Sequence, residues 1–212
     1  MERVDARRRA YEVLDKADVA RGRAVRICEM ALYMFMEDGD MKEARSLLRG
    51  GLMYGPAYHG TIYRGWIAME ADHAGNVDAA RVLFEEWCAL SGGKDGGFWC
   101  RYIAFEARHG GARRSRDVAE AAVRACPDDP AVHAKYAKLE LRLGQDGRAF
   151  AVLGSALAAF ASDAGAQEWL VDEVRGYYDA LRKQSLTGRI RSFCRGIRRC
   201  HPPHGYKRLQ SV

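Results

Sequence analysis

The stretch that decides the fold is YRGWIAME, residues 63–70, because variants of it occur twice more along the chain. It recurs 36 residues later as WCRYIAFE, residues 99–106, and after a further 34 residues as HAKYAKLE, residues 133–140. Each copy places aromatic and apolar side chains on one face of a helix and ends in a glutamate. A period of this length predicts a chain built from copies of one small helical unit.

A break follows each copy, and a second motif follows the break after the first two copies, whereas Ala149-Phe150 stands in its place after the third. The breaks are glycines, at Gly75, Gly110–Gly111 and Gly144, where a helix is expected to end. The motif after the break is a small residue followed by arginine, as in Ala44-Arg45, Ala80-Arg81 and Ser115-Arg116. One unit is therefore two antiparallel helices and a turn, and the small residues of the second helix let it approach the bulky side chains of the first.

These units predict an all-α fold, an α-α superhelix in which antiparallel helix pairs form a right-handed solenoid of about ten to eleven helices. We expect a single repeat domain over residues 1–200 and a basic tail over 201–212. The expected division is an unpaired N-terminal helix at 3–18 and units at about 22–55, 57–91, 97–128, 130–161 and 165–200. In the first unit Met30 and Met34 stand where Trp66 and Glu70 stand in the second.

The repeat resembles the half-a-TPR (HAT) family, a branch of the TPR-like superfamily, over about residues 60 to 160. The HAT unit has an aromatic-rich first helix that ends in glutamate and a second helix bearing Ala-Arg and an aromatic residue. The residues that carry this resemblance are Trp66, Glu70, Ala80, Arg81, Phe84, Trp99, Tyr102, Glu106, Arg116, Tyr136 and Glu140. The resemblance implies a scaffold of RNA-processing assemblies, since HAT proteins include splicing, cleavage-stimulation, pre-ribosomal and organellar mRNA factors.

The glutamates and arginines of the repeat are interpreted as structural ion pairs. Glu70 lies 11 residues before Arg81, and Glu106 lies 10 residues before Arg116. We expect each pair to link the two helices of one unit, because a catalytic pair has no reason to recur with a repeat. The aromatic residues are likewise expected to fill the core and not to stack on bases.

Other patterns that carry chemistry are weak. The six histidines share no spacing with a serine, cysteine or carboxylate that predicts a catalytic triad. The glycine-rich segment 92–97 lacks the Gly-Lys-Ser/Thr ending of a phosphate loop and is interpreted as a loop between repeats. The six cysteines have no C-x-x-C spacing and are expected to be reduced, and residues 200–204 (CHPPH) lack a fourth zinc ligand. No enzyme, metal, cofactor or small-molecule substrate is predicted.

Positive charge is concentrated at the C-terminal end. The last acidic residue is Asp179, and nine basic residues follow it, so residues 1–181 carry 25 basic against 28 acidic residues, a net charge of −3, within an overall +6. A basic stripe on a helix suits RNA phosphates or an acidic partner, although a solvated helix face has the same composition. The candidate binding residues are Arg189, Arg191, Arg195, Arg198, Arg199, Lys207 and Arg208.

The sequence therefore predicts a non-enzymatic scaffold that binds protein partners and RNA within a ribonucleoprotein complex. A TPR-like adaptor or structural subunit of a complex unrelated to RNA is the alternative. The first helix lacks a partner helix before it, so either the chain is a fragment of a longer solenoid, or the flank around Tyr11 and Leu14 is a protein interface. With no long apolar run and no signal or transit pattern, no membrane contact is expected. We expect an intracellular protein, in the nucleus or alternatively in a mitochondrion or chloroplast.

Overall fold

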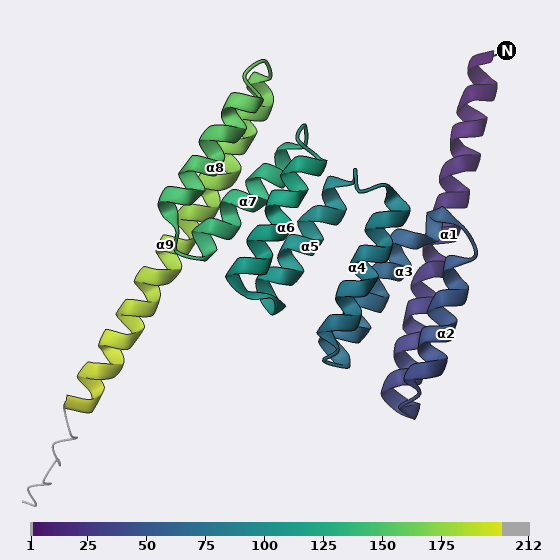
Figure 1. The fold of residues 1–212 in the computed structure, drawn as a ribbon, viewed down its shortest axis with the longest axis horizontal. Helices are drawn as coiled ribbons and strands as arrows, with labels where there is room; N and C mark the ends of the chain where they lie inside the picture. Colours follow the sequence, from purple (N-terminus) through teal and green to yellow (C-terminus); the bar gives the residue numbers. More distant parts are fainter. Residues whose placement is uncertain (1, 201–212) are drawn as a thin grey trace, which may run out of the picture. The chain divides into compact units, whose positions relative to one another are not determined.

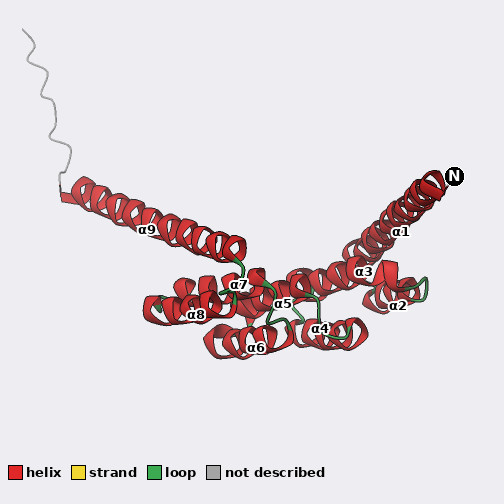
Figure 2. Ribbon diagram, turned by 90° about the horizontal axis from the view of Figure 1, so that it is seen from above, coloured by secondary structure: helices red, strands yellow, loops and turns green. Residues whose placement is uncertain are grey.

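A computed structural model describes the backbone of residues 2–200, and the side chains of residues 19–37 and 39–183. Figures 1 and 2 show helices joined by short loops, and the described residues contain no strand. The all-α prediction is therefore confirmed. The helices are α1 (Glu2–Asp38), α2 (Met41–Leu52), α3 (Pro56–Ala68) with a π-helical turn η1 (Met69–His73), α4 (Val77–Ser91), α5 (Gly96–His109), α6 (Gly111–Ala125), α7 (Pro130–Arg142), α8 (Asp146–Ala159) and α9 (Ala164–Cys200).

The helix boundaries follow from capping residues and glycines in the sequence. The carboxylate of Asp40 accepts from the backbone N–H of Glu43 at the start of α2, and Asp129 caps α7 just before Pro130. An N-cap carboxylate satisfies a backbone donor that the first helical turn leaves unpaired. Gly75 and Gly144 turn the chain with φ of 67° and 71°, values that a residue with a Cβ rarely adopts.

The two ends of the chain differ from the prediction. Residues 3–18 do not form a separate helix, because α1 runs without a break from Glu2 to Asp38. The segment 165–200 is likewise one helix, α9, and not a helix pair. Neither segment contains a proline, and a lone glycine such as Gly22 or Gly188 weakens a helix by only about 1 kcal/mol. Nine α-helices therefore stand where about ten or eleven were expected in residues 2–200.

The chain divides into two compact units, Met1–Phe98 and Trp99–Val212. Each is described by itself, and a single repeat domain over 1–200 stays a prediction. In the first unit α1, α2, α3 and α4 pack in succession, with α1 contacting both α2 and α3. Its aromatic centre is Trp87, which stacks on Tyr63 with the ring centroids 5.9 Å apart and meets Phe98 edge-on at 5.1 Å.

Small residues let the helices of the first unit come close together. A Cβ at Gly65 of α3 would lie 2.5 Å from Sγ of Cys28 on α1, and one at Gly51 of α2 would lie 2.7 Å from Cδ1 of Ile62 on α3. Ala31 of α1 is completely buried. Leaving out a side chain on one helix makes room for a larger one on the next.

In the second unit α7 is the central helix and contacts α6, α8 and α9. Its core is built from alanines of α7 and α8, among them Ala137 and Ala156, against Leu170 and Val174 of α9. Phe160 closes the end of this core and meets the ring of His133 edge-on. None of the helices in the described part of the chain is long and apolar enough to cross a bilayer.

Candidate functional site

The first polar site of the chain is an ion pair between α2 and η1. The guanidinium of Arg45 donates two parallel hydrogen bonds to Glu70, from Nε to Oε1 at 2.7 Å and from Nη2 to Oε2 at 2.8 Å. Glu70 is only 1% exposed, whereas the Arg45 side chain is 41% exposed. The bidentate geometry is the strong form of a carboxylate contact, and it holds a buried charge that would otherwise be unstable.

Further donors complete the surroundings of Glu70. The indole Nε1 of Trp66 donates to Oε1 at 3.0 Å, and the backbone N–H of Asn76 donates to the carbonyl of Glu70 at 2.7 Å. Burial by itself raises the pKa of the Glu70 carboxyl, but the hydrogen bonds that this carboxyl receives from the side chains of Arg45, Trp66 and Asn76 outweigh burial and hold that pKa below its ordinary value. Glu70 is therefore a fixed anion and not a proton-transfer group.

The second unit repeats this arrangement between α6 and α7. Nε of Arg116 donates to Oε1 of Glu140 at 2.7 Å, and Nη2 donates to Oε2 at 2.8 Å. The Glu140 side chain is fully buried, and Nε of Arg148 lies 3.4 Å from its Oε1. The two arginines are 71 residues apart and the two glutamates 70, which is two repeat periods. The same interface is thus built twice from the same repeat positions.

The predicted pairing of these residues is wrong. The sequence paired Glu70 with Arg81 and Glu106 with Arg116, inside one unit, whereas Glu70 binds Arg45 and Arg116 binds Glu140. Each arginine reaches the first helix of the following repeat, 24 or 25 residues on. The spacing along the chain favoured the arginine that is nearest to each glutamate in sequence. In the structure each of these two arginines instead faces the first helix of the repeat that follows it. The pair joins consecutive repeats and does not close one of them.

An aromatic residue lies one helical turn before each of these glutamates and also contacts the preceding helix. The guanidinium of Arg49 lies 5.6 Å from the ring centre of Trp66, and the hydroxyl of Tyr136 donates to Glu120 at 3.3 Å. Arg49 and Glu120 are 71 residues apart, the same separation as Arg45 and Arg116. Trp66 and Tyr136 are both buried, as the sequence predicted for core-filling aromatics.

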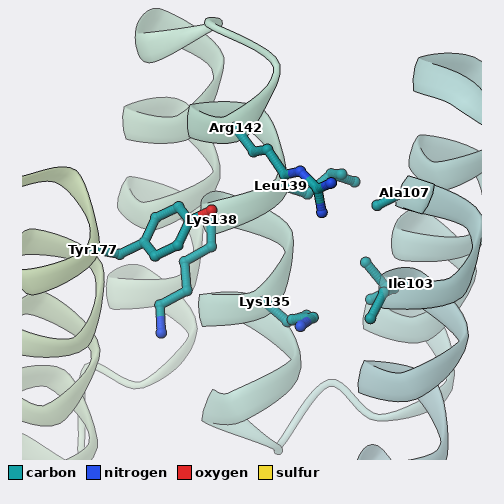
Figure 3. A pocket seen from close by; sticks show the side chains of 8 residues that line it. Ile103, Ala107, Lys135, Lys138, Leu139, Arg142 and Tyr177 are labelled. Carbon is teal, nitrogen blue, oxygen red and sulfur yellow. The ribbon is translucent and has the colours of Figure 1, made fainter. Parts of the chain in front are cut away.

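A hollow in the second unit is the best candidate for a binding site, and Figure 3 shows it between α5, α7 and α9. It has a volume of about 90 Å³. Its apolar floor is made by Ile103 and Ala107 of α5 with Leu139 of α7, and Tyr177 of α9 stands on the opposite side of α7. Because three different helices contribute side chains, the hollow exists only in the folded chain.

Two cations of α7, Lys135 and Arg142, lie beside this floor, and a third, Lys138, extends toward Tyr177 on the other side of α7 (Figure 3). Lys138 is engaged, since its Nζ is hydrogen-bonded to Glu173 and lies 5.7 Å from the ring centre of Tyr177. Lys135 and Arg142 have no ion-pair partner within the described part of the chain. The two positive charges beside the apolar floor, Lys135 and Arg142, therefore suit an acidic ligand with an apolar side chain.

Of the other residues that the sequence analysis singled out, some have described side chains and the rest do not. In the second unit Trp99 and Glu106 are buried and Tyr102 is half-buried, stacked on Trp99 with the ring centroids 6.4 Å apart. Arg81 of the first unit bonds Asp78 at 2.7 Å. The candidate RNA residues and the candidate interface at Tyr11 and Leu14 lie outside the described side chains, and Lys207 and Arg208 lie outside the described backbone as well.

The sequence interpretation missed the cationic residues of the hollow. Lys135, Lys138 and Arg142 follow the spacing i, i+3 and i+7, which places them on one helical face beside the buried repeat positions. This spacing could have identified a basic stripe on α7. The contribution of Tyr177 could not have been read from it, because α5 and α9 reach α7 from distant parts of the chain.

The remaining chemical groups do not form a reactive cluster. The described cysteines, Cys28, Cys88, Cys100 and Cys126, are all free thiols. Burial raises the pKa of the Cys28 thiol to about 11, the largest influence on it, so the thiolate is not formed near neutral pH. In the part of the chain that the structure describes, no three His, Cys, Asp or Glu side chains lie close enough to hold a metal ion.

Comparison with known proteins adds no relative. No family model matches the chain, and no curated protein matches it.

Proposed function

We propose that this chain is a non-enzymatic helical-repeat scaffold, which holds an acidic segment of a protein partner in the hollow between α5, α7 and α9. The observation that carries the proposal is a pair of cations, Lys135 and Arg142, that have no ion-pair partner among the described side chains and lie beside the apolar floor of Ile103 and Leu139. A cation beside an apolar surface binds a carboxylate and an apolar side chain of the same segment together.

The class of complex rests on the resemblance to HAT repeats. The twofold occurrence of the bidentate pair, Arg45 with Glu70 and Arg116 with Glu140, supports repeat units that stack in the same manner. A right-handed solenoid of HAT type is the arrangement we propose from this repetition. By that resemblance the complex is a ribonucleoprotein or RNA-processing assembly, in which the basic C-terminal segment meets RNA.

The hollow can be tested with a defined probe, a fluorescent peptide of alternating glutamate and leucine. The variant Lys135→Glu/Arg142→Glu should weaken binding to the full chain about tenfold or more, because two attractive charges become repulsive. Arg113→Glu/Arg114→Glu is the matched control, since both residues are exposed on α6 and do not line the hollow. Equal loss in the two variants, or none, contradicts the proposed site.

The RNA part of the proposal has its own test. Changing Arg191, Arg195 and Arg198 to glutamate should abolish a salt-sensitive gel shift with single-stranded RNA, because each phosphate contact adds to the salt dependence of binding. A chain that never shifts RNA, but still binds the acidic peptide, favours the alternative, an adaptor of a complex unrelated to RNA. Turnover of a substrate by the purified chain would contradict both.

A further inference from the structure

The first unit has an open apolar groove between α1 and α2. It is lined by Met30, Tyr33 and Met34 of α1, by Glu43, Leu47 and Gly50 of α2 and by Tyr54, which follows α2, and its volume is about 640 Å³. Met30 is 57% exposed, and Tyr33 and Tyr54 are each 61% exposed. Large apolar side chains gathered in one exposed groove mark an interaction surface more often than isolated ones do.

The repeat shows which kind of element covers such a face. Met30 and Met34 occupy the positions of Trp66 and Glu70, 36 residues later. In the first unit the face formed by Trp66 and Glu70 is covered by α2, which contacts these two residues through Arg49 and Arg45. In the second unit the same face of α7, at Tyr136 and Glu140, is covered by α6. Twice in this chain, therefore, the occupant of this position is a helix.

We propose that the groove between α1 and α2 binds an amphipathic helix of a partner protein, which lies on α1 as α2 lies on α3. This inference rests on the scaffold function proposed above and adds a second surface to it. The partner helix carries apolar residues at the two positions, four apart, where α2 carries Arg45 and Arg49. Met34 has no carboxylate to receive a guanidinium, so an arginine over it would lack the bidentate partner that Arg45 has in Glu70; the carboxylate that lines the groove, Glu43, belongs to α2 and not to the α1 face. Methionines instead accommodate varied apolar side chains.

A second copy of the chain is a poorer occupant. It would have to offer two exposed apolar residues four apart on one helix. Among the exposed large apolar side chains of the described residues, no such pair occurs outside the groove itself: Val82, Leu90, Phe150 and Trp169 each stand alone at that spacing. Within the described side chains, residues 19–37 and 39–183, a second copy therefore offers no matching helix, and the occupant we propose is a helix of a different protein.

The test uses two peptides based on α6, the helix that fills the equivalent position in the second unit. One has the sequence of Gly111–Ala125 unchanged, and the other carries R116L and E120L, which supplies the apolar pair. Fluorescence anisotropy with the full chain should show the leucine peptide binding about tenfold tighter than the unchanged one. Equal binding, or a preference for the unchanged peptide, overturns the proposal.

The chain variants make the test specific. Met30→Tyr/Met34→Glu copies the residues found at 136 and 140, so it should reverse the preference and gain affinity for the unchanged α6 peptide. That gain also proves that the variant is folded. Met36→Glu is the control, because Met36 is an exposed methionine of α1 that does not line the groove, and it should leave the preference unchanged.

Two further outcomes would overturn the inference. A reversal that fails, with both peptides bound as before, shows that Met30 and Met34 do not contact the helix. Self-association of the full chain in sedimentation velocity that disappears in Met30→Tyr/Met34→Glu assigns the groove to a second copy. Either result leaves the hollow of the second unit untouched, since that site is tested with the glutamate–leucine peptide and with Lys135→Glu/Arg142→Glu.

Discussion

The contact of α2 with α3 and η1 in the first unit and that of α6 with α7 in the second are two versions of one interface. The charged pair is the same in both, with hydrogen bonds of 2.7 and 2.8 Å in each. The neighbouring contact differs, since Arg49 lies over the Trp66 ring whereas Tyr136 donates to Glu120. An indole ring attracts a cation to its face, whereas a phenol hydroxyl donates a hydrogen bond to a carboxylate. The partner residue on the preceding helix therefore differs where the aromatic residue differs, arginine for Trp66 and glutamate for Tyr136.

This difference shows which part of the interface sets the alignment of the helices. A bidentate arginine–carboxylate pair has one geometry, so it determines how far one helix can slide along the other. The contact of the aromatic residue constrains the helix positions less, and its chemistry differs between the two units. The face of α1 has neither, because methionines replace both residues, and it is the face left open in the first unit.

The largest effect is expected when the charged pair of the first unit is broken. Arg45→Ala leaves the nearly fully buried Glu70 without its counter-ion and should lower the free energy of unfolding by about 3 kcal/mol. Urea denaturation of the full chain at pH 7 measures it. Arg45→Met/Glu70→Met, which copies the apolar character of the α1 face, should recover much of the loss. A double variant no more stable than Arg45→Ala would contradict this account.

A smaller loss is expected where α1 and α3 touch. Gly65→Ala places a methyl group 2.5 Å from Sγ and 2.8 Å from Cβ of Cys28, so one helix must move. Overpacking of this kind should cost about 2 kcal/mol, measured as a lower urea midpoint. The control is Gly50→Ala, because a Cβ at Gly50 meets no atom within 4 Å. Equal stability of the two variants would mean that α1 and α3 are less closely packed than described.

Acid should weaken the first unit through Glu70. Its pKa is lowered in the folded chain, so the unfolded chain takes up the proton first as the pH falls. The stabilisation is complete above the ordinary glutamate pKa of about 4.3 and is lost as the pH falls through the lower folded value, by at most about 1.4 kcal/mol per pH unit. Urea midpoints between pH 6 and 3 should fall less steeply in Glu70→Gln than in the unchanged chain. Parallel curves would exclude Glu70 as a source of acid sensitivity.

The smallest effect is expected at the variable contact. Tyr136→Phe removes the hydroxyl that donates to Glu120 and should lower the free energy of unfolding by about 1 kcal/mol. Tyr33→Phe is the control, because Tyr33 is exposed, and should change nothing measurable. A loss at Tyr136 as large as that at Arg45 would mean that the aromatic contact, and not the charged pair, dominates the interface.

Much of the fold could be predicted from local patterns. The recurring aromatic faces, the glycines at 75 and 144 and the Pro-Asp-Asp-Pro segment at 127–130 mark helices and their ends, and the helices begin and end there. The absence of a break at Gly22 was harder to predict, since a single glycine costs a helix little. The prediction was wrong at both ends of the chain because it placed a helix boundary inside α1 and another inside α9, where the local signal for a break is weak.

The sequence by itself determined the all-α class, the burial of Trp66, Trp99 and Tyr136, and the recurrence of glutamate at 70, 106 and 140 and of arginine at 45, 81 and 116, because periodicity and side-chain polarity are local properties. Only the tertiary structure decided that Arg45 binds Glu70 and that Arg116 binds Glu140. Tertiary packing also brought α5, α7 and α9 around one hollow, and it left the α1–α2 groove uncovered. Which side chains meet across helices depends on how the helices pack, and spacing along the chain does not contain that information.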